Sequence, residues 1–365
     1  MRRRTALVVT VAAVFTLVAG GLTLPRPPQP STDAIGDAAL SELLAEALER
    51  NPGALDAVSI AVVDDNGVRY SGVRSGPDTE FEIGSVTKTF TAALLADSLN
   101  RGEVTPGQPL GELLDLGTSP AASITLEQLA THTSGLPRLP LTVGTFVGAL
   151  WSQFSAGDPY TADVDRLVSQ ARAATPGETG TVEYSNFGMA LLGQALAAAA
   201  DTEYSTLVTE RITGPLGMDA SYLPVDTSGL ARDAPTGYTA SGRSAKPWTL
   251  KANAPAGGLR STATDMALYA RALLEGTAPG IDALDPTTDA GGGDRIGYAW
   301  FTSTLRSSVT GEEASDRLFT WHNGMTGGYA AFIGLDFEAD RAIVVMSNTA
   351  ATVDTIGVEL LEAAR

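Results

Sequence analysis

The chain contains no cysteine and only two histidines among its 365 residues. Without cysteine it forms no disulfide bond and carries no lipid on an N-terminal cysteine. With His132 and His322 alone, it cannot build a His/Cys zinc site. It also lacks a Gly-x-Ser-x-Gly sequence and any Gly-Lys pair, which excludes the nucleophile turn of α/β-hydrolases and the phosphate loop of nucleotidases. No metal or cofactor is therefore expected.

Positive charge is also scarce. The chain has 24 lysine and arginine residues against 42 aspartate and glutamate residues, and its formal net charge is −18. An acidic surface repels phosphate backbones, so nucleic acid is not expected as a partner. The hydrophobic content of 44% and the charged content of 18% are typical of globular proteins. The length allows two domains, or one domain with a large insertion and a large core.

The N-terminus has the pattern of an export segment. Residues 2–4 are arginines, and residues 6–24 are almost entirely apolar. Residues 18–20 form a plausible cleavage site, but the apolar run is also nearly long enough to remain as a membrane anchor. A proline-rich spacer follows and ends at residue 30. We therefore expect a protein that is secreted or tethered to the outer face of the cytoplasmic membrane, with residues 31–365 forming its hydrolase domain.

Lysine is much scarcer than arginine, with only Lys88, Lys246 and Lys251 in the chain. Lys88 lies three residues after Ser85, within an apolar stretch over residues 81–90. Arginine keeps its proton near neutral pH, whereas a desolvated lysine can lose it. The pair Ser85-x-x-Lys88 is therefore interpreted as a nucleophile beside its activating amine. The alternative is a chance pair on a surface helix.

Periodicity predicts strands near both ends of the chain and helices between them. We expect a helix over 35–50, a hairpin with strands at 58–62 and 68–73, and a helix over 84–100. Further helices are predicted at 125–132, 161–174, 187–200, 205–213, 262–275 and 351–363, a loop at 276–294, and strands at 296–303, 316–322, 329–336 and 341–347. This order predicts an α+β fold, an α/β sandwich in which N- and C-terminal segments form one antiparallel sheet. A mostly helical insertion would cover roughly residues 103–255, and the site would lie in the cleft between the two parts.

A second motif is Tyr184-Ser185-Asn186, just before an apolar helix pattern. A tyrosine beside a cation can be held as a phenolate and act as a general base. The Asn186 amide can donate to a substrate carbonyl and accept from a substrate N–H. The alternative is an asparagine helix cap beside a packed tyrosine.

A third motif is His322-Asn323-Gly324 at the end of a strand pattern. A histidine here can give a hydrogen bond or a positive charge to a substrate carboxylate, and Gly324 permits close approach of a ligand. The backbone N–H of Met325 would be an oxyanion donor. The alternative is a strand edge with a glycine bulge.

Taken in this order, the three motifs resemble those of the penicillin-recognising serine hydrolases, and the resemblance covers roughly residues 35–365. The most similar group contains class C β-lactamases, D-alanyl-D-alanine carboxypeptidases and related esterases. Residues 132–137 (His-Thr-Ser-Gly-Leu-Pro), 215–218, 257–262 and 265–266 also look like segments of this family, and we interpret them as scaffold. His132 is expected to be a structural residue at a helix end.

The resemblance implies a role for each motif residue. Ser85 would be acylated, and Lys88 and Tyr184 would move protons, with the identity of the main base left open. Asn186 would hold the substrate amide, Gly324 would leave the strand open to substrate, and the N–H groups of Ser85 and Met325 would form the oxyanion hole.

The third motif also departs from the family pattern. His322 stands where β-lactamases of this group usually have lysine and some carboxypeptidases have histidine. Asn323 and Met325 are further differences, expected near the acyl pocket. A neutral histidine binds a carboxylate less strongly than lysine, so the β-lactamase interpretation is weakened.

The resulting hypothesis is an exported serine hydrolase that forms an acyl-Ser85 intermediate with a small-molecule or peptide substrate. A D-alanyl-D-alanine carboxypeptidase is favoured, then a β-lactamase, then a carboxylesterase. The alternative from another class is a non-catalytic penicillin-recognising binding or sensor module. A Ser-His-Asp triad of Ser85 and His322 would leave Lys88 without a role. The sequence does not define the oligomeric state.

Overall fold

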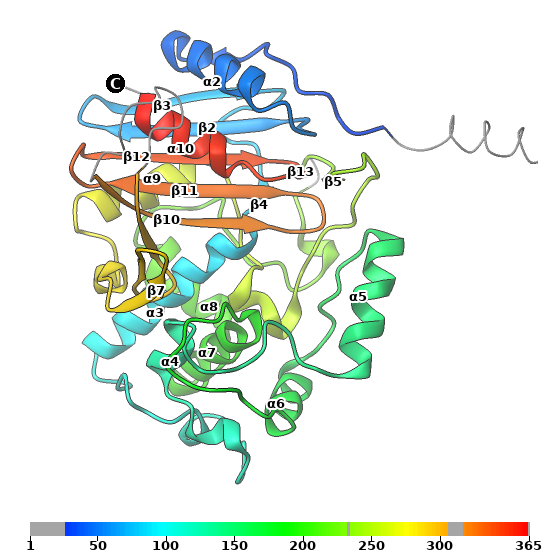
Figure 1. The fold of residues 1–365 in the computed structure, drawn as a ribbon, viewed down its shortest axis with the longest axis vertical. Helices are drawn as coiled ribbons and strands as arrows, with labels where there is room; N and C mark the ends of the chain where they lie inside the picture. The colour runs from blue at the N-terminus through cyan, green and yellow to red at the C-terminus, as the bar shows by residue number, and fades with distance from the viewer. Residues whose placement is uncertain (1–25, 232–233, 306–316, 364–365) are drawn as a thin grey trace, which may run out of the picture.

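The computed structural model describes residues 26–231, 234–305 and 317–363 (Figure 1). The predicted export segment therefore lies outside the described residues, except for the end of its proline-rich spacer. Within the described ranges, no helix is both long and apolar enough to cross a membrane.

One antiparallel sheet with the strand order β1-β3-β2-β12-β11-β10-β9-β8-β7 forms the centre of the described structure. Its strands are β1 (Ile35–Gly36), β2 (Val58–Asp64), β3 (Gly67–Val73), β7 (Thr288–Gly291), β8 (Asp294–Ile296), β9 (Phe301–Thr304), β10 (Leu318–Met325), β11 (Ala330–Asp336) and β12 (Arg341–Ser347). The pairing of β2 with β12 joins the N-terminal hairpin to the C-terminal strands, which confirms the predicted architecture.

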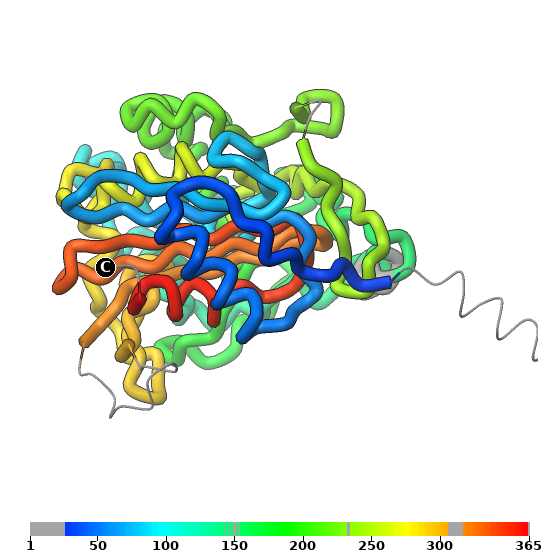
Figure 2. The backbone as a smooth tube through the Cα atoms, turned by 90° about the horizontal axis from the view of Figure 1, so that it is seen from above, coloured from blue at the N-terminus to red at the C-terminus, as the bar shows by residue number. Residues whose placement is uncertain are grey.

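Both faces of the sheet are covered by helices. Neighbouring residues of a strand point to opposite sides, so each face buries its own set of side chains. On β2, Ile60 and Val62 join the apolar cluster with α2 (Ala38–Arg50) and α10 (Asp354–Ala363). Figure 2 shows these two helices (blue and red) on the same face of the sheet. Ala61 and Val63 join the larger cluster on the other face, which includes α9 (Ala263–Leu274) and α3 (Thr87–Asn100). Buried on both faces, β2 has an almost continuous apolar sequence.

The helical middle packs beneath the sheet, around α3 (Figure 1). It contains α4 (Leu126–Ala130), α5 (Val143–Ser155), α6 (Val164–Arg172), α7 (Asn186–Ala199) and α8 (Tyr204–Val208), which continues as a π-helix, η4 (Thr209–Thr213). Two short pairs complete the fold: β4 (Phe81–Glu82) with β6 (Arg260–Ser261), and β5 (Tyr238–Thr239) with β13 (Thr349–Ala350).

Two predictions of local structure were wrong. The segment 276–294, expected to be a loop, contains the strands β7 and β8, which extend the sheet next to β9. The helix α5 was not predicted, because its sequence combines two glycines with β-branched residues and has no charge. The Thr142 side chain caps its first turn by accepting from the Thr145 backbone N–H.

Candidate active site

Ser85 lies in a 3-10 turn, η1 (Gly84–Val86), that leads directly into α3. Gly84 has a φ of 51°, and a Cβ at this position would come within 2.6 Å of the Met325 backbone nitrogen. Only glycine adopts this conformation at little cost and leaves the space free. The turn places Ser85 at the N-terminal end of α3, where the helix dipole favours developing negative charge.

The end of β10 presses against this turn. A Cβ added to Gly324 would overlap the Ile83 carbonyl oxygen and lie 2.8 Å from the Ser85 nitrogen. The segments that carry the Ser85 and Met325 N–H groups are therefore in direct contact, as two donors to one oxyanion must be. The Met325 side chain is 47% exposed, so it stands at the mouth of the site rather than in its interior.

Lys88 lies one turn after Ser85 and is completely buried. Its Nζ is 2.8 Å from Ser85 Oγ and donates to the Ala256 carbonyl oxygen at 2.5 Å. Burial holds the pKa of Lys88 well below its usual range, and the charge of Arg138 lowers it further. A neutral amine can accept the Ser85 proton, so the spacing and the environment of this pair fit nucleophile activation.

Tyr184 stands above Lys88, with Lys88 Nζ 4.9 Å from the centre of its ring. Burial raises the pKa of Tyr184, although the hydrogen bond with Ser85 and the charge of Arg138 act against this shift. The resting phenol is therefore protonated, and the expectation of a phenolate is not supported. A protonated Tyr184 is placed to donate a proton, whereas Lys88 is placed to accept one.

His132 lies just beyond α4, with a positive φ of 59°, and is fully buried. Its Nδ1 accepts from the Ser185 backbone N–H at 3.3 Å, its carbonyl oxygen accepts from the Glu183 N–H, and its ring packs 4.6 Å from that of Tyr184. These contacts hold the segment that carries Tyr184. They agree with the structural role expected from the sequence.

Asn186 begins α7, and the cap of this helix is Ser185, not Asn186. The Asn186 Nδ2 donates to the Tyr160 hydroxyl at 3.2 Å, and its Oδ1 is buried without a partner among the described residues. A buried acceptor without a partner is costly. The free oxygen fits the predicted contact with a substrate N–H.

His322 lies on β10, with its ring centre 6.3 Å from that of Tyr184. Burial lowers the pKa of His322 to about 3, and its Nδ1 lies 2.6 Å from the Asn323 carbonyl oxygen. At neutral pH His322 is uncharged, so it supplies no positive charge to a substrate carboxylate. A Ser-His-Asp triad is not formed either, because the Nδ1 faces a backbone carbonyl instead of a carboxylate.

The expectation that Asn323 lies near the acyl pocket was wrong. Its Nδ2 donates to Asp354 Oδ2 of α10 at 2.6 Å. Since neighbouring residues of β10 point to opposite faces, Asn323 faces the α2 and α10 side while His322 faces the site.

Arg138 is a site residue that the sequence analysis did not identify. Its side chain is exposed, and its guanidinium carbon lies 5.1 Å from the centre of the Tyr184 ring. Its charge contributes to the pKa shifts of Lys88, His132 and Tyr184. The only available signal was its position directly after the motif of residues 132–137. With Lys88 and His322 neutral, Arg138 is the permanent charge beside Tyr184.

Replacing Arg138 with glutamine is expected to move the acid limb of the kcat/KM profile to higher pH. Without the nearby positive charge the pKa of Lys88 rises, so a higher pH is needed to keep its amine neutral. Arg138→Lys preserves the charge and should leave the limb in place. A neutral aryl ester is a suitable substrate, and an unchanged limb in Arg138→Gln would contradict this electrostatic role.

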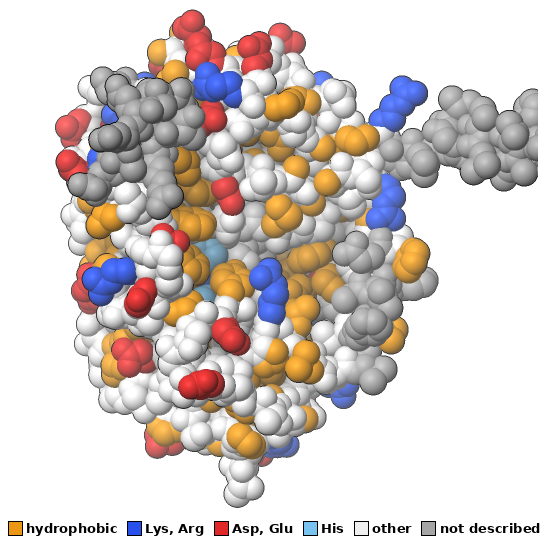
Figure 3. Space-filling model, in the orientation of Figure 1, with side chains coloured by type: hydrophobic (Ala, Val, Ile, Leu, Met, Phe, Trp, Pro, Cys, Tyr) orange, Lys and Arg blue, Asp and Glu red, His pale blue; other side chains and the backbone are white. Residues whose placement is uncertain are grey.

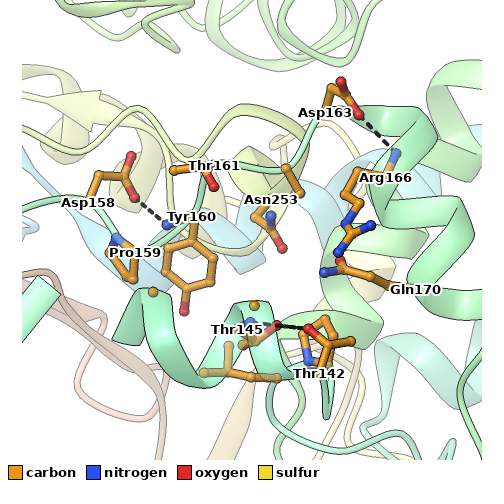
Figure 4. A pocket seen from close by; sticks show the side chains of 15 residues that line it. Thr142, Thr145, Asp158, Pro159, Tyr160, Thr161, Asp163, Arg166, Gln170 and Asn253 are labelled. Atoms are coloured by element: carbon orange, nitrogen blue, oxygen red, sulfur yellow. Dashed lines mark hydrogen bonds between the residues drawn. The ribbon is translucent and has the colours of Figure 1, made fainter. Parts of the chain in front are cut away.

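The site opens on the face shown in Figure 3, where histidine atoms are visible inside a hollow. A cavity of about 430 Å³ is lined by Tyr160, the residue whose hydroxyl accepts from the Asn186 amide (Figure 4). Tyr160 and the cavity were also missed by the sequence analysis. No group of three or more His, Cys, Asp or Glu side chains in the described part of the chain is arranged to hold a metal ion.

A sheet of this order with a serine and a buried lysine at the start of its central helix defines a class of proteins. The family model described as Beta-lactamase matches residues 43–362, and the chain belongs to this family. The chain is 28% identical over 320 residues to unguisins hydrolase ungD' of Aspergillus campestris, covering 78% of this chain and 55% of that protein. It is 36% identical over 159 residues to D-alanyl-D-alanine-carboxypeptidase/endopeptidase AmpH of Escherichia coli, covering 42% and 39%. The chain thus spans about half or less of the length of these curated relatives.

Solved structures share the fold over almost the whole described chain. A class C β-lactamase from Rhodobacter sphaeroides has a TM-score of 0.71 at 22% identity, covering 87% of this chain and 97% of that one. A β-lactamase/D-alanine carboxypeptidase from Pseudomonas syringae has a TM-score of 0.74 at 18% identity, covering 90% and 100%. These similarities confirm the β-lactamase/transpeptidase-like fold.

Proposed function

We propose that the protein is a serine hydrolase that works through an acyl-Ser85 intermediate. The observation that carries this proposal is the 2.8 Å separation of Ser85 Oγ and the fully buried Lys88 Nζ. Lys88 takes the Ser85 proton as Oγ attacks the substrate carbonyl, and the Ser85 and Met325 N–H groups stabilise the oxyanion. Tyr184 then donates its proton to the leaving group, and the bond between carbonyl carbon and leaving group breaks.

Deacylation reverses these proton movements with water. Tyr184, left as a phenolate by the first step, regains its proton from Lys88 or directly from the attacking water. The water oxygen forms the new bond to the acyl carbon, and Ser85 Oγ leaves and takes up a proton. The two groups thus end the cycle in the protonation states in which they began it.

For the substrate, we propose a peptide or amide with a D-alanyl-D-alanine-like end. The similarity to AmpH and to the Pseudomonas syringae protein supports this choice, as does a histidine in the third motif. A β-lactam and a short ester are the next candidates. The arginine-rich, apolar start of the sequence supports export to the outer face of the membrane or beyond it.

Ser85→Ala is expected to abolish acylation and leave the fold intact, since it removes one hydroxyl from a turn that Gly84 and Gly324 shape. A fluorophosphonate probe or a labelled penicillin should attach to wild-type Ser85 and not to Ser85→Ala, as seen by mass spectrometry. Release of the penicilloyl group supports an enzyme, whereas a permanent adduct supports the sensor alternative. A wild-type protein that neither probe labels would contradict both.

Three substrates distinguish the reactions within the proposal. Initial rates on a D-Ala-D-Ala peptide, a chromogenic cephalosporin and a short-chain p-nitrophenyl ester should rank the peptide first. A higher kcat/KM for the cephalosporin would reassign the protein as a β-lactamase, and one for the ester would reassign it as an esterase.

A further inference from the structure

The cavity beyond Tyr160 has the features of a binding site in its own right. It lies between α5, α6 and the loop over residues 156–163, and its volume is about 430 Å³ (Figure 4). This volume falls within the range of small-molecule sites. Polar side chains gather in its lining, among them Thr142, Tyr160, Arg166, Gln170 and Asn253.

Asn253 is the first sign that the cavity is built for a ligand. Its side chain is 5% exposed, on the 3-10 helix η6 (Lys251–Ala256), and lines the cavity. It makes no hydrogen bond to any other described residue, and Figure 4 shows its amide directed into the open space. Its donor and its acceptor are therefore both free to bond to a ligand that fills the cavity. A ligand amide would satisfy its donor and its acceptor together.

Arg166 supplies the positive charge of the cavity. It lies in the first turn of α6, and no described carboxylate lies within 4 Å of its guanidinium. The lining also contains two carboxylates, which accept backbone hydrogen bonds. Asp158 accepts from the backbone N–H groups of Tyr160, Thr249 and Leu250, and Asp163 caps α6 through the Arg166 backbone N–H.

In Figure 4 the Arg166 guanidinium lies beside the Gln170 amide at one end of the cavity. An arginine without an acidic partner beside polar side chains is suited to a carboxylate. Asn253 and Arg166 together therefore fit a ligand with both an amide and a carboxylate.

The cavity shares a wall with the active site. The Tyr160 hydroxyl that lines it is bonded to Asn186, two residues after Tyr184. Leu139, also in the lining, follows Arg138, whose guanidinium lies over the Tyr184 ring. A chain bound by the free Asn186 Oδ1 would therefore reach the cavity by passing Tyr160.

We propose that this cavity binds the distal part of the substrate's acyl chain, a peptide segment that carries a carboxylate. The carboxylate pairs with Arg166, and a backbone amide of the segment bonds to Asn253. This inference rests on the proposed function and adds to it the acyl-side chemistry of the substrate.

Binding to the Ser85→Ala protein tests the cavity without turnover. The ligands are Ac-Glu-Gly-D-Ala-D-Ala, the matched Ac-Gln-Gly-D-Ala-D-Ala and the short Ac-D-Ala-D-Ala, with Kd measured by calorimetry. The Glu peptide should bind about three- to tenfold more tightly than the Gln peptide, as a partly exposed ion pair allows. Arg166→Gln should remove this preference without changing the Kd of the short peptide.

Arg172→Gln is the matched control, since Arg172 lies six residues further along α6 and pairs with Asp115 instead of lining the cavity. It should keep the preference for Glu. Asn253→Ala should weaken both long peptides by a similar factor and leave the short one unchanged. Equal Kd values for the Glu and Gln peptides, or an equal loss for the short peptide in Arg166→Gln, would overturn the proposal.

The two proposals fail in different ways. If the wild-type Ser85 is labelled by a fluorophosphonate but the Glu preference is absent, the hydrolase proposal stands and the cavity proposal falls. If the Glu preference depends on Arg166 but Ser85 cannot be labelled, the cavity proposal stands and the acyl-enzyme falls.

Discussion

Replacing Lys88 with arginine is expected to slow acylation of Ser85 by roughly 10²- to 10⁴-fold, the usual contribution of a general base. Arginine carries a positive charge and does not give up its proton near neutral pH. The Ser85 hydroxyl would therefore lose the amine that now lies 2.8 Å away. The rate of fluorophosphonate labelling at Ser85 measures this step directly.

Lys251→Arg serves as the control, because Lys251 is exposed and should tolerate the change. Circular dichroism of both variants separates a chemical effect from unfolding. Near-normal labelling in a folded Lys88→Arg protein would show that acylation of Ser85 does not need proton transfer to residue 88.

The burial of Lys88 also makes the stability of the protein depend on pH. The pKa of Lys88 is depressed in the folded protein and about 10.4 in the unfolded chain. Between these two values the unfolded chain binds more protons, so this group makes the free energy of unfolding rise with pH. Lys88→Met should remove that dependence. Its gain in stability over wild type should be largest at or below the folded pKa and should fade towards pH 10, as thermal melts across pH would show.

The sequence predicted the parts of the site that depend on local spacing. Ser85 and Lys88 are three residues apart at a helix start, so their contact follows from helical geometry once the helix is assigned. The pairing of the terminal strands was predicted because strand patterns occur near both ends of the chain with helix patterns between them. The turn at Gly84 was not predicted, because the helix was expected to begin at residue 84.

What the sequence did not predict depends on contacts between distant segments. Arg138 and Tyr160 reach the site from loops whose paths are fixed by tertiary packing. The protonation state of Tyr184 was mispredicted because the opposing effects of burial and a nearby cation can be weighed only when the degree of burial is known. The orientation of the Asn323 side chain was predicted wrongly for a similar reason. Its strand was assigned, but the face of the sheet occupied by α10 was not.

Gly324→Ala is expected to reduce kcat/KM by roughly 10²- to 10³-fold, the effect of losing one oxyanion donor. The added methyl would collide with the Ile83 carbonyl oxygen and lie 2.8 Å from the Ser85 nitrogen. Since both atoms belong to the backbone and cannot rotate away, β10 and the η1 turn must separate. The Met325 and Ser85 N–H groups would then no longer point to one position.

The same separation should lower the free energy of unfolding by about 1–3 kcal/mol, as overpacking does. Gly107→Ala is the matched control, because a Cβ at that exposed position meets nothing within 4 Å and needs no left-handed backbone. Steady-state kinetics and chemical denaturation of the two variants give both quantities. A Gly324→Ala protein with wild-type kinetics would mean that the contact between β10 and the Ser85 turn is not needed for catalysis. The oxyanion would then have to be stabilised elsewhere.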